Sequence, residues 1–307
     1  MRNPVAVATT NAFENRQDKR MDGLCLASQR PRANVLGIQV EALDMERALS
    51  RIANALRTGH KGYVCAINVH SVMEAQRDAD LAATFAGAEV TVPDGMPTVW
   101  VGRLQGHRHM QRVAGPDLMY EIFRRNEFAG CKHFFYGGNE GVAQELAANF
   151  GRRFPWVRIV GTYTPPYRSL TRTEEQCLIN TVSACKPDII WVGISTPKQE
   201  KFMRRYLPEL ETRLMFGVGA AFDFHTGHIQ DCPEWIKRAG LQWLHRLVQE
   251  PKRLWWRYLR NNPAFLFQIA LQLTGLRTYL PTSTSDTMTR SSSSDVLPPF
   301  RPTGPEC

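Results

Sequence analysis

The stretch PDIIWVGISTPKQEKFMRRYL, residues 187–207, decides the fold. It contains an uninterrupted apolar run, Ile189–Ile194, then a short turn with Pro197, then a helical pattern over Lys198–Leu207. A continuous apolar run of this length is typical of a strand that is buried on both faces, as strands are in a parallel sheet. The segment therefore predicts one strand–helix unit of an α/β fold.

The same unit recurs along the chain. Further candidate strands are Tyr63–Asn68, Glu89–Val92, His133–Tyr136, Val157–Val160 and Leu214–Val218. Further candidate helices are Asp44–Arg57, Ser71–Phe85, Pro116–Asn126, Gly141–Phe154 and Thr173–Ala184. Strands that alternate with helices of this length predict a Rossmann-like, mostly parallel sheet with helices on both faces. Such sheets bind ligands at the carboxyl ends of their strands.

The chain divides into four segments by composition. Residues 1–33 are polar and aperiodic and are expected to form a flexible extension, while residues 278–307 form a Ser/Thr/Pro-rich tail that cannot build a core. Residues 34–233 carry the α/β pattern. Residues 234–277 break it and predict two or three consecutive helices, here called the C-terminal helices.

Composition limits the class of protein. The chain has 307 residues, of which 43% are hydrophobic and 22% charged, so it is globular rather than disordered. Its seven cysteines are scattered, which favours a reducing compartment over a disulfide framework. The first 30 residues lack the apolar stretch of a secretory signal, and the longest uncharged run, Asn261–Leu276, is too short and too polar to span a bilayer.

A strand-ending segment, TVPDGMP (91–97), places Asp94 in a turn framed by proline and glycine at a carboxyl edge. A turn aspartate often does no more than bond its own backbone. The alternative is a general base that Val92 and Met96 partly shield from water. Spacing alone leaves both interpretations open.

Two glycine-containing turns follow strands. The stretch HFFYGGNEG (133–141) carries Gly137 and Gly138 into a helix, and GVGAA (217–221) carries Gly219 after another strand. Glycines let a backbone approach a phosphate, although an ordinary tight turn has the same pattern. GVGAA lacks the third glycine of a dinucleotide fingerprint and is weak evidence for NAD.

The sequence offers no convincing metal site. Asp78-Ala79-Asp80 matches the DxD pattern of metal-dependent sugar transferases, but it falls within the helical stretch predicted for Ser71–Phe85, where the two carboxylates would point apart on a solvated face. The histidine pairs are His107 with His109 and His225 with His228, and neither pair has carboxylate partners at ligand spacing.

The net charge of +9 is concentrated in residues 234–277, which carry eight Lys/Arg and two acidic residues. Four of the seven tryptophans lie there too, at positions 235, 243, 255 and 256. Guanidinium groups grip phosphate in a bidentate manner and tryptophan prefers the membrane interface, so a diphosphate-bearing ligand or an anionic bilayer fits this segment. A solvated amphipathic face is the plainer alternative.

Four segments together resemble the WecG/TagA/CpsF glycosyltransferases, family 26 of the sequence-based classification. They are VPDGMPTVW (92–100) with RVAGPDL (112–118), FFYGGNEGVA (134–143), PDIIWVGISTPKQEKF (187–202), and GVGAAFDFHTG (217–227) with WIKRAGLQWLHRLVQEPKRLWWRYLRNNP (235–263). The resemblance covers about residues 34–277 in the family's order. It implies an inverting, metal-independent glycosyltransferase that needs no cofactor and moves a sugar from a UDP-sugar to a lipid-diphosphate-linked saccharide.

The resemblance also assigns site residues. Asp94 matches the family's proposed base, and Arg246, Arg253 and Arg257 match arginines thought to reach the diphosphate. The other expected substrate-binding positions are Asn68, Arg112, Gly137, Gly138, Gln199, Gly219 and Asp223. Two positions depart from the family pattern: Ala66 stands where a threonine is frequent, and Trp256 where a second basic residue is frequent.

The expected partners follow from the same resemblance. They are the UDP-sugar, a polyprenyl-diphosphate-linked acceptor and an anionic membrane surface that residues 234–277 contact, which places the protein on the cytoplasmic face of a bacterial plasma membrane. N-acetylmannosamine, glucose and uronic acids are all compatible as the sugar, and self-association is compatible with this picture. The rival hypotheses are an NAD-dependent oxidoreductase, with Glu234 as the nearest acidic partner of GVGAA, and a nucleic-acid-binding module.

Overall fold

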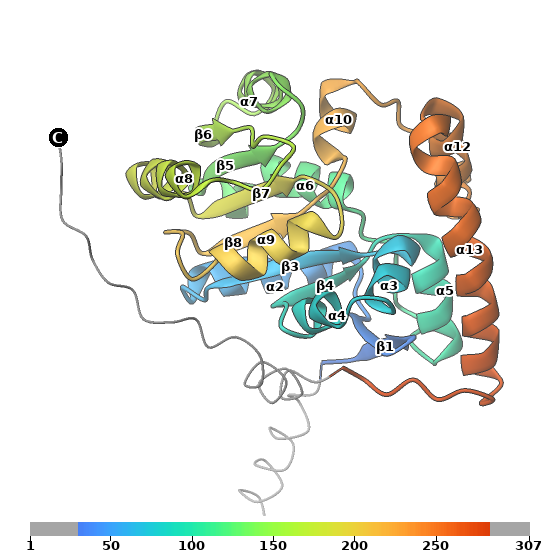
Figure 1. The fold of residues 1–307 in the computed structure, drawn as a ribbon. Helices are drawn as coiled ribbons and strands as arrows, with labels where there is room; N and C mark the ends of the chain where they lie inside the picture. Colours follow the sequence, from blue (N-terminus) through green and yellow to red (C-terminus); the bar gives the residue numbers. More distant parts are fainter. Residues whose placement is uncertain (1–29, 283–307) are drawn as a thin grey trace, which may run out of the picture. The chain divides into compact units, whose positions relative to one another are not determined.

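The computed structural model describes residues 30–282, and those from Ala33 onward belong to one compact unit built on a six-stranded sheet (Figure 1). The sheet order is β4-β3-β8-β7-β5-β6, and every neighbouring pair is parallel. The strands are β3 (Gly62–Ile67), β4 (Val90–Pro93), β5 (Lys132–Gly137), β6 (Arg158–Tyr163), β7 (Ile189–Gly193) and β8 (Leu214–Gly217). Two short strands, β1 (Arg32–Val35) and β2 (Ile38–Glu41), form a separate two-stranded sheet.

Helices cover both faces of the large sheet, because successive strand residues point to opposite sides. In β3, Cys65 and Ile67 belong to one hydrophobic core, and Val64 and Ala66 to the other. The first core includes residues of α3 (Val69–Ala75), α4 (Ala79–Ala86), α5 (Met96–Leu104), α8 (Arg172–Cys185) and α9 (Lys198–Tyr206). The second includes residues of α2 (Met45–Arg57), α6 (Gly115–Arg124), α7 (Val142–Arg153) and α10 (Ala221–Thr226).

The C-terminal helices are α11 (Glu234–Arg238), α12 (Gln242–Gln249) and α13 (Pro251–Leu273). Figure 1 shows α12 and α13, in orange to red, along one side of the α/β body. Helix α13 packs on α3 and buries Leu254, Phe265 and Ile269. None of the helices in residues 30–282 combines the length and the apolarity that crossing a bilayer requires.

The predicted fold class is confirmed, and all six predicted strands are present within a few residues of their expected bounds. The single helix predicted for Ser71–Phe85 is wrong. Asp78 caps a new helix, because its side chain accepts a hydrogen bond from the backbone N–H of Leu81 at 3.1 Å, and this cap separates α3 from α4. The predicted N-terminal extension (1–33) and Ser/Thr/Pro tail (278–307) lie mostly outside the described residues.

Candidate active site

Loops at the carboxyl edge of the sheet meet around one cleft of about 1280 Å³. They follow all six strands of the sheet, while α12 and α13 contribute a further wall. The predicted site residues that line the cleft are Asn68, Asp94, Arg112, Gly138, Gln199, Gly219, Asp223, Arg246, Arg253 and Arg257. The structure thus gathers residues from most of the length of the chain at the edge where a parallel sheet binds its ligands.

Gly137 lies outside the lining of the cleft. Its φ is +126°, and a Cβ atom there would stand 2.6 Å from the carbonyl oxygen of Gly193. The next residue, Gly138, donates its backbone N–H to that same oxygen at 3.0 Å. The absence of a side chain at Gly137 is therefore explained by the close approach of two neighbouring strands rather than by a bound phosphate.

Asp94 directly follows β4, and Asn68 directly follows its neighbour β3. Asn68 caps α3: its Oδ1 accepts from the backbone N–H of Ser71 at 3.1 Å, so its Nδ2 faces away and donates to Oδ2 of Asp94 at 3.2 Å. Burial raises the pKa of Asp94 above the usual carboxyl range, against the opposing charge of Arg112 and the Asn68 hydrogen bond. A raised pKa in a cleft suits a group that accepts a proton during a reaction.

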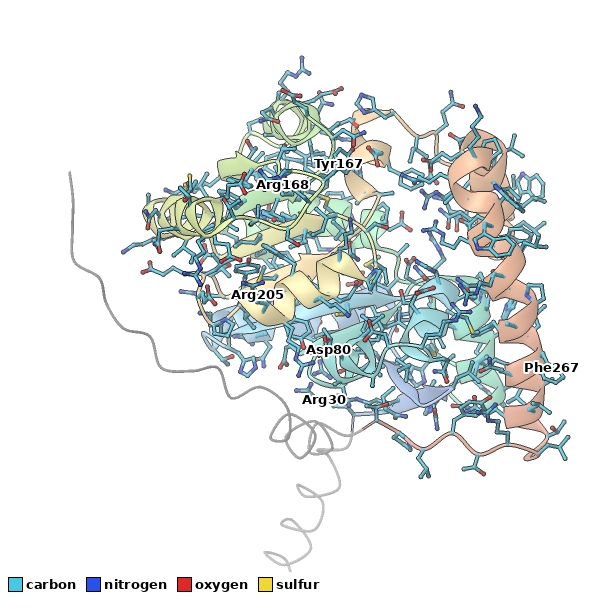
Figure 2. All side chains as sticks on the ribbon, viewed as in Figure 1. Arg30, Asp80, Tyr167, Arg168, Arg205 and Phe267 are labelled. Carbon is cyan, nitrogen blue, oxygen red and sulfur yellow. The ribbon has the colours of Figure 1, made fainter. Side chains whose placement is uncertain are left out.

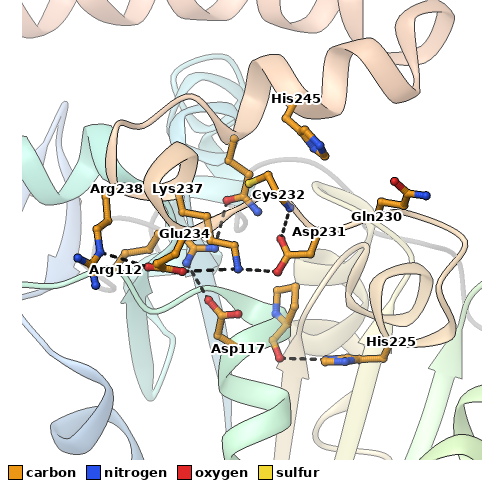
Figure 3. A network of polar contacts seen from close by, with 12 residues as sticks. Arg112, Asp117, His225, Gln230, Asp231, Cys232, Glu234, Lys237, Arg238 and His245 are labelled. Carbon is orange, nitrogen blue, oxygen red and sulfur yellow. Dashed lines mark hydrogen bonds and ion pairs between the residues drawn. The ribbon is translucent and has the colours of Figure 1, made fainter.

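Arg112 lines the cleft and contacts both α6 and the C-terminal helices; Figure 3 shows its side chain beside Asp117. Its Nη1 donates to Asp117 at 2.7 Å and its Nη2 donates to Oε1 of Gln242, in α12, at 3.1 Å. Nearby, Lys237 forms ion pairs with Asp231 and Glu234. The Nε of Arg112 is buried and has no hydrogen-bond partner among the described residues, and each Nη atom carries a second hydrogen besides the one donated to Asp117 or Gln242.

Gln199 is buried and joins two loops. Its Nε2 donates to Glu200 Oε1 at 2.9 Å, and its Oε1 accepts from the backbone N–H of Gly219 at 3.0 Å. Thr196 also donates to Glu200 Oε1, at 2.9 Å. Because an amide nitrogen carries two hydrogens, Gln199 keeps one N–H for a ligand in the cleft it lines. The N–H of Gly219, in contrast, is already used.

The wall of the cleft that α12 and α13 form carries three of the predicted arginines, Arg246, Arg253 and Arg257. Arg246 and Arg253 both donate to Oε2 of Glu250, at 3.0 and 2.8 Å. Arg257 lies over the ring of Tyr258, with 5.4 Å from Cζ to the ring centroid. Like the Nε of Arg112, the Nε atoms of Arg246 and Arg257 are buried without a hydrogen-bond partner in the part of the chain that the structure describes.

Asp223, in α10, is the second carboxylate among the predicted residues of the cleft. Burial raises its pKa, while the charge of Arg253 opposes the rise. Of the two departures from the family pattern, Ala66 lines the cleft and Trp256 does not. A hydroxyl that a threonine would offer at position 66 is therefore missing from the cleft wall.

The remaining sequence candidates lie elsewhere. Asp78 and Asp80 do not point apart, as the single predicted helix would require; both approach the ammonium group of Lys201, at 2.6 and 3.9 Å. Glu234 is on α11 and pairs with Lys237 and Arg238 rather than ending a strand, so the dinucleotide hypothesis gains no support. Within residues 30–282, no group of three or more His, Cys, Asp or Glu side chains is placed to hold a metal ion.

Four residues of the site region were not assigned a role from the sequence: Asp117, Gln242, His70 and Asn261. Asp117 and Gln242 both accept hydrogen bonds from Arg112. Asn261 of α13 contacts His70 of α3, at 3.1 Å from Nδ2 to Nδ1. The contacts of Gln242 and Asn261 join residues 130 and 191 positions apart, and only the folded chain shows them.

Comparison with known proteins matches residues 33–279 to the model of the glycosyl transferase WecG/TagA/CpsF family. Two curated relatives carry the name N-acetylglucosaminyldiphosphoundecaprenol N-acetyl-beta-D-mannosaminyltransferase. The protein of Bacillus subtilis (strain 168) is 24% identical over 224 residues, which is 73% of this chain and 84% of the relative. The protein of Bacillus spizizenii (strain ATCC 23059 / NRRL B-14472 / W23) is 26% identical over 231 residues, 74% of this chain and 87% of the relative.

Proposed function

The chain belongs to the WecG/TagA/CpsF family of glycosyl transferases, and on that premise we propose that it transfers a sugar from a UDP-sugar to a lipid-diphosphate-linked saccharide with inversion at the anomeric carbon and without a metal ion. The relatives' names describe transfer of N-acetylmannosamine to an N-acetylglucosaminyl-diphosphoundecaprenol acceptor, so acceptors of that chemical class are the first to test.

One observation carries the proposal: a carboxylate with a raised pKa lines the same cleft as four arginines, Arg112, Arg246, Arg253 and Arg257. A guanidinium carries five N–H donors in a planar fork that matches the oxygens of a phosphate. Four such groups in the wall of one cleft suit an anionic ligand, and a diphosphate is the anion of both proposed substrates.

In the proposed reaction, Asp94 and the arginines have separate roles. Asp94 takes the proton of the acceptor hydroxyl, and that oxygen forms a bond to the anomeric carbon while the bond from this carbon to the UDP oxygen breaks. The electron pair of the broken bond leaves with UDP, whose diphosphate becomes more negative. Arginine guanidinium groups fixed beside the cleft stabilise this growing charge without reorganising, which is the role a metal ion fills in other transferases.

A membrane contact fits the outer surface of α13. Trp255, Trp256, Leu259 and Phe267 are exposed and do not line the cleft, and Figure 2 shows Phe267 pointing away from the body. Each Lys or Arg near an anionic lipid surface contributes about 1 kcal/mol to binding. We therefore expect flotation with anionic vesicles to exceed flotation with neutral ones, and to fall in a Lys252→Glu/Arg260→Glu variant.

The deciding experiment is UDP release from a panel of UDP-sugars with a lipid-diphosphate-linked acceptor saccharide. Asp94→Asn is expected to bind UDP as the wild type does and to lose turnover, because the amide cannot accept the proton. Asp80→Asn makes the same change at a carboxylate outside the cleft and serves as the control. Near-wild-type turnover by Asp94→Asn would show that Asp94 is not the base.

A further inference from the structure

An apolar arm of the cleft lies between α5 and α13. Its lining comes from Met96, Trp100, Val101 and Leu104 of α5 and from Phe265, Leu266 and Ile269 of α13. Phe265 and Ile269 are buried, whereas Leu104 and Leu266 are 70% and 66% exposed. Exposed leucines in a concave apolar surface indicate a ligand that covers them.

Both walls of the arm start at the catalytic end of the cleft. Helix α5 begins two residues after Asp94, and α13 carries Arg257 about two and a half turns before Leu266. The walls converge at the other end on one backbone oxygen: Nε2 of Gln105 and Nε2 of Gln272 both donate to the carbonyl of Asn34, at 2.7 and 2.8 Å. Nine residues of α5 give the arm a length of about 13 Å.

The turn between α11 and α12 closes the arm on a third side. Gly240 in this turn has φ +71°, and a Cβ atom there would stand 2.6 Å from Cη2 of Trp100. The backbone of the C-terminal helices therefore rests on the indole ring of α5. The arm residues line the same cleft as the cationic groups of α12 and α13.

We propose that this arm binds the first isoprenoid units of the lipid acceptor, next to its diphosphate. The proposal rests on the proposed function. A polyprenyl diphosphate joins an anion directly to an apolar chain, and α13 presents the same order to the cleft: Arg257, then the apolar residues of the arm. A bilayer surface is a different partner, because the outer side chains of α13, such as Phe267, lie outside the arm.

The chain offers a matched pair for the test. Leu266 and Phe267 are neighbours in α13 and are both 66% exposed, but only Leu266 lines the arm. Leu266→Gln and Leu104→Gln replace arm residues, and Phe267→Gln is the control. Glutamine keeps the side-chain length and suits a helix, so exposed positions should tolerate it.

The assay compares two soluble acceptors that share the saccharide-diphosphate head and carry either a farnesyl or a methyl tail. The wild type should have the lower KM for the farnesyl acceptor. Each arm variant should raise that KM about tenfold, the size expected when one leucine loses an apolar partner, and leave kcat and the KM for the methyl acceptor unchanged. Phe267→Gln should behave as the wild type in this assay, because Phe267 belongs to the proposed membrane contact and the soluble acceptors need no bilayer.

Three results would overturn the proposal: equal wild-type KM values for both tails, equal losses in Leu266→Gln and Phe267→Gln, or a loss that extends to the methyl acceptor. A binding titration separates this failure from failure of the proposed function. Even if no UDP-sugar is turned over, farnesyl diphosphate should quench tryptophan fluorescence at lower concentration than inorganic diphosphate does, and Leu104→Gln should abolish that difference. Equal titration by both compounds also contradicts the arm.

Discussion

Truncation of Asn261 to alanine should loosen α13 from the body. The Asn261 side chain is 2% exposed, and its Oδ1 accepts from both Nη atoms of Arg77 at 3.1 Å. A guanidinium only donates, so the atom that faces it must be the amide oxygen, and the amide nitrogen must face Nδ1 of His70 at 3.1 Å. Nδ1 therefore accepts, which requires a neutral His70. Burial accordingly lowers the pKa of His70 to about 4.

The size of the effect follows from what each partner loses. His70 Nδ1 would be left without its donor in a largely buried junction, which costs about 1–3 kcal/mol. Arg77 keeps its ion pair with Glu74 at 3.0 Å and is 31% exposed, so water replaces part of what it loses and its share is about 1 kcal/mol. The docking of α13 should therefore weaken by about 2–4 kcal/mol.

Hydrogen exchange of the amides in 251–273 measures this loss directly, because local opening of α13 need not unfold the sheet. Asn261→Ala should raise exchange rates there by at least tenfold while β7 and β8 stay protected. Asn262→Ala removes the same atoms one position along the helix without touching Arg77 or His70, and is the control. Equal exchange in the two variants would refute the reasoning about the junction.

The remaining predictions concern chemistry and pH. Arg246→Ala should lower kcat by about 10²–10³ with little change in the KM for the donor, as steady-state kinetics would show, because the Arg246 guanidinium, whose charge acts on Asp94, stabilises the charge that grows on the leaving UDP. Turnover should be the same with and without EDTA, and a loss that added Mg²⁺ or Mn²⁺ restores would contradict the metal-free mechanism. Burial lowers the pKa of His133 to about 3, whereas a histidine in an unfolded chain has a pKa near 6.5. Between these two pH values the unfolded chain therefore binds a proton at His133 that the folded protein does not bind, and the folded state loses stability as the pH falls. The free energy of unfolding of the wild type, measured against His133→Asn by urea titration, should therefore fall by about 2 kcal/mol from pH 7 to pH 5.

The sheet could be predicted because all its strands except the edge strand β6 are buried on both faces. Runs such as Ile189–Ile194 are apolar without interruption, and only the centre of a parallel sheet accommodates them. The helix break at Asp78 was missed because the apolar pattern continues across it, whereas the cap depends on a single side-chain hydrogen bond. Helix α5 was missed because it starts at a Gly-Met-Pro sequence, which is typical of a turn. Proline is, however, also common in the first turn of a helix.

The site was predictable where strand ends determine it. Asp94 and Asn68 follow adjacent parallel strands, so their proximity follows from sheet order alone. Gly137 was predicted to bind a ligand. A glycine that allows two strands to pack closely and a glycine that lets a backbone approach a phosphate have the same local sequence pattern. The contact between Arg112 and Gln242 depends on where the C-terminal helices dock, which no local pattern encodes.

Helix α13 also shows why a helical wheel misses the most informative pattern in this chain. Arg257, Asn261, Phe265 and Ile269 follow one another at steps of four and form its inward stripe, which changes from charged to polar to apolar over about 18 Å. A helical wheel compares the faces around the helix axis and does not register a change of polarity along that axis. A ligand that lies along such a stripe must itself change from anionic to apolar over a similar length. A free nucleotide or a free sugar lacks the apolar end, so the gradient favours a lipid that carries a phosphate or diphosphate, the class to which the proposed acceptor belongs, as the molecule that α13 faces.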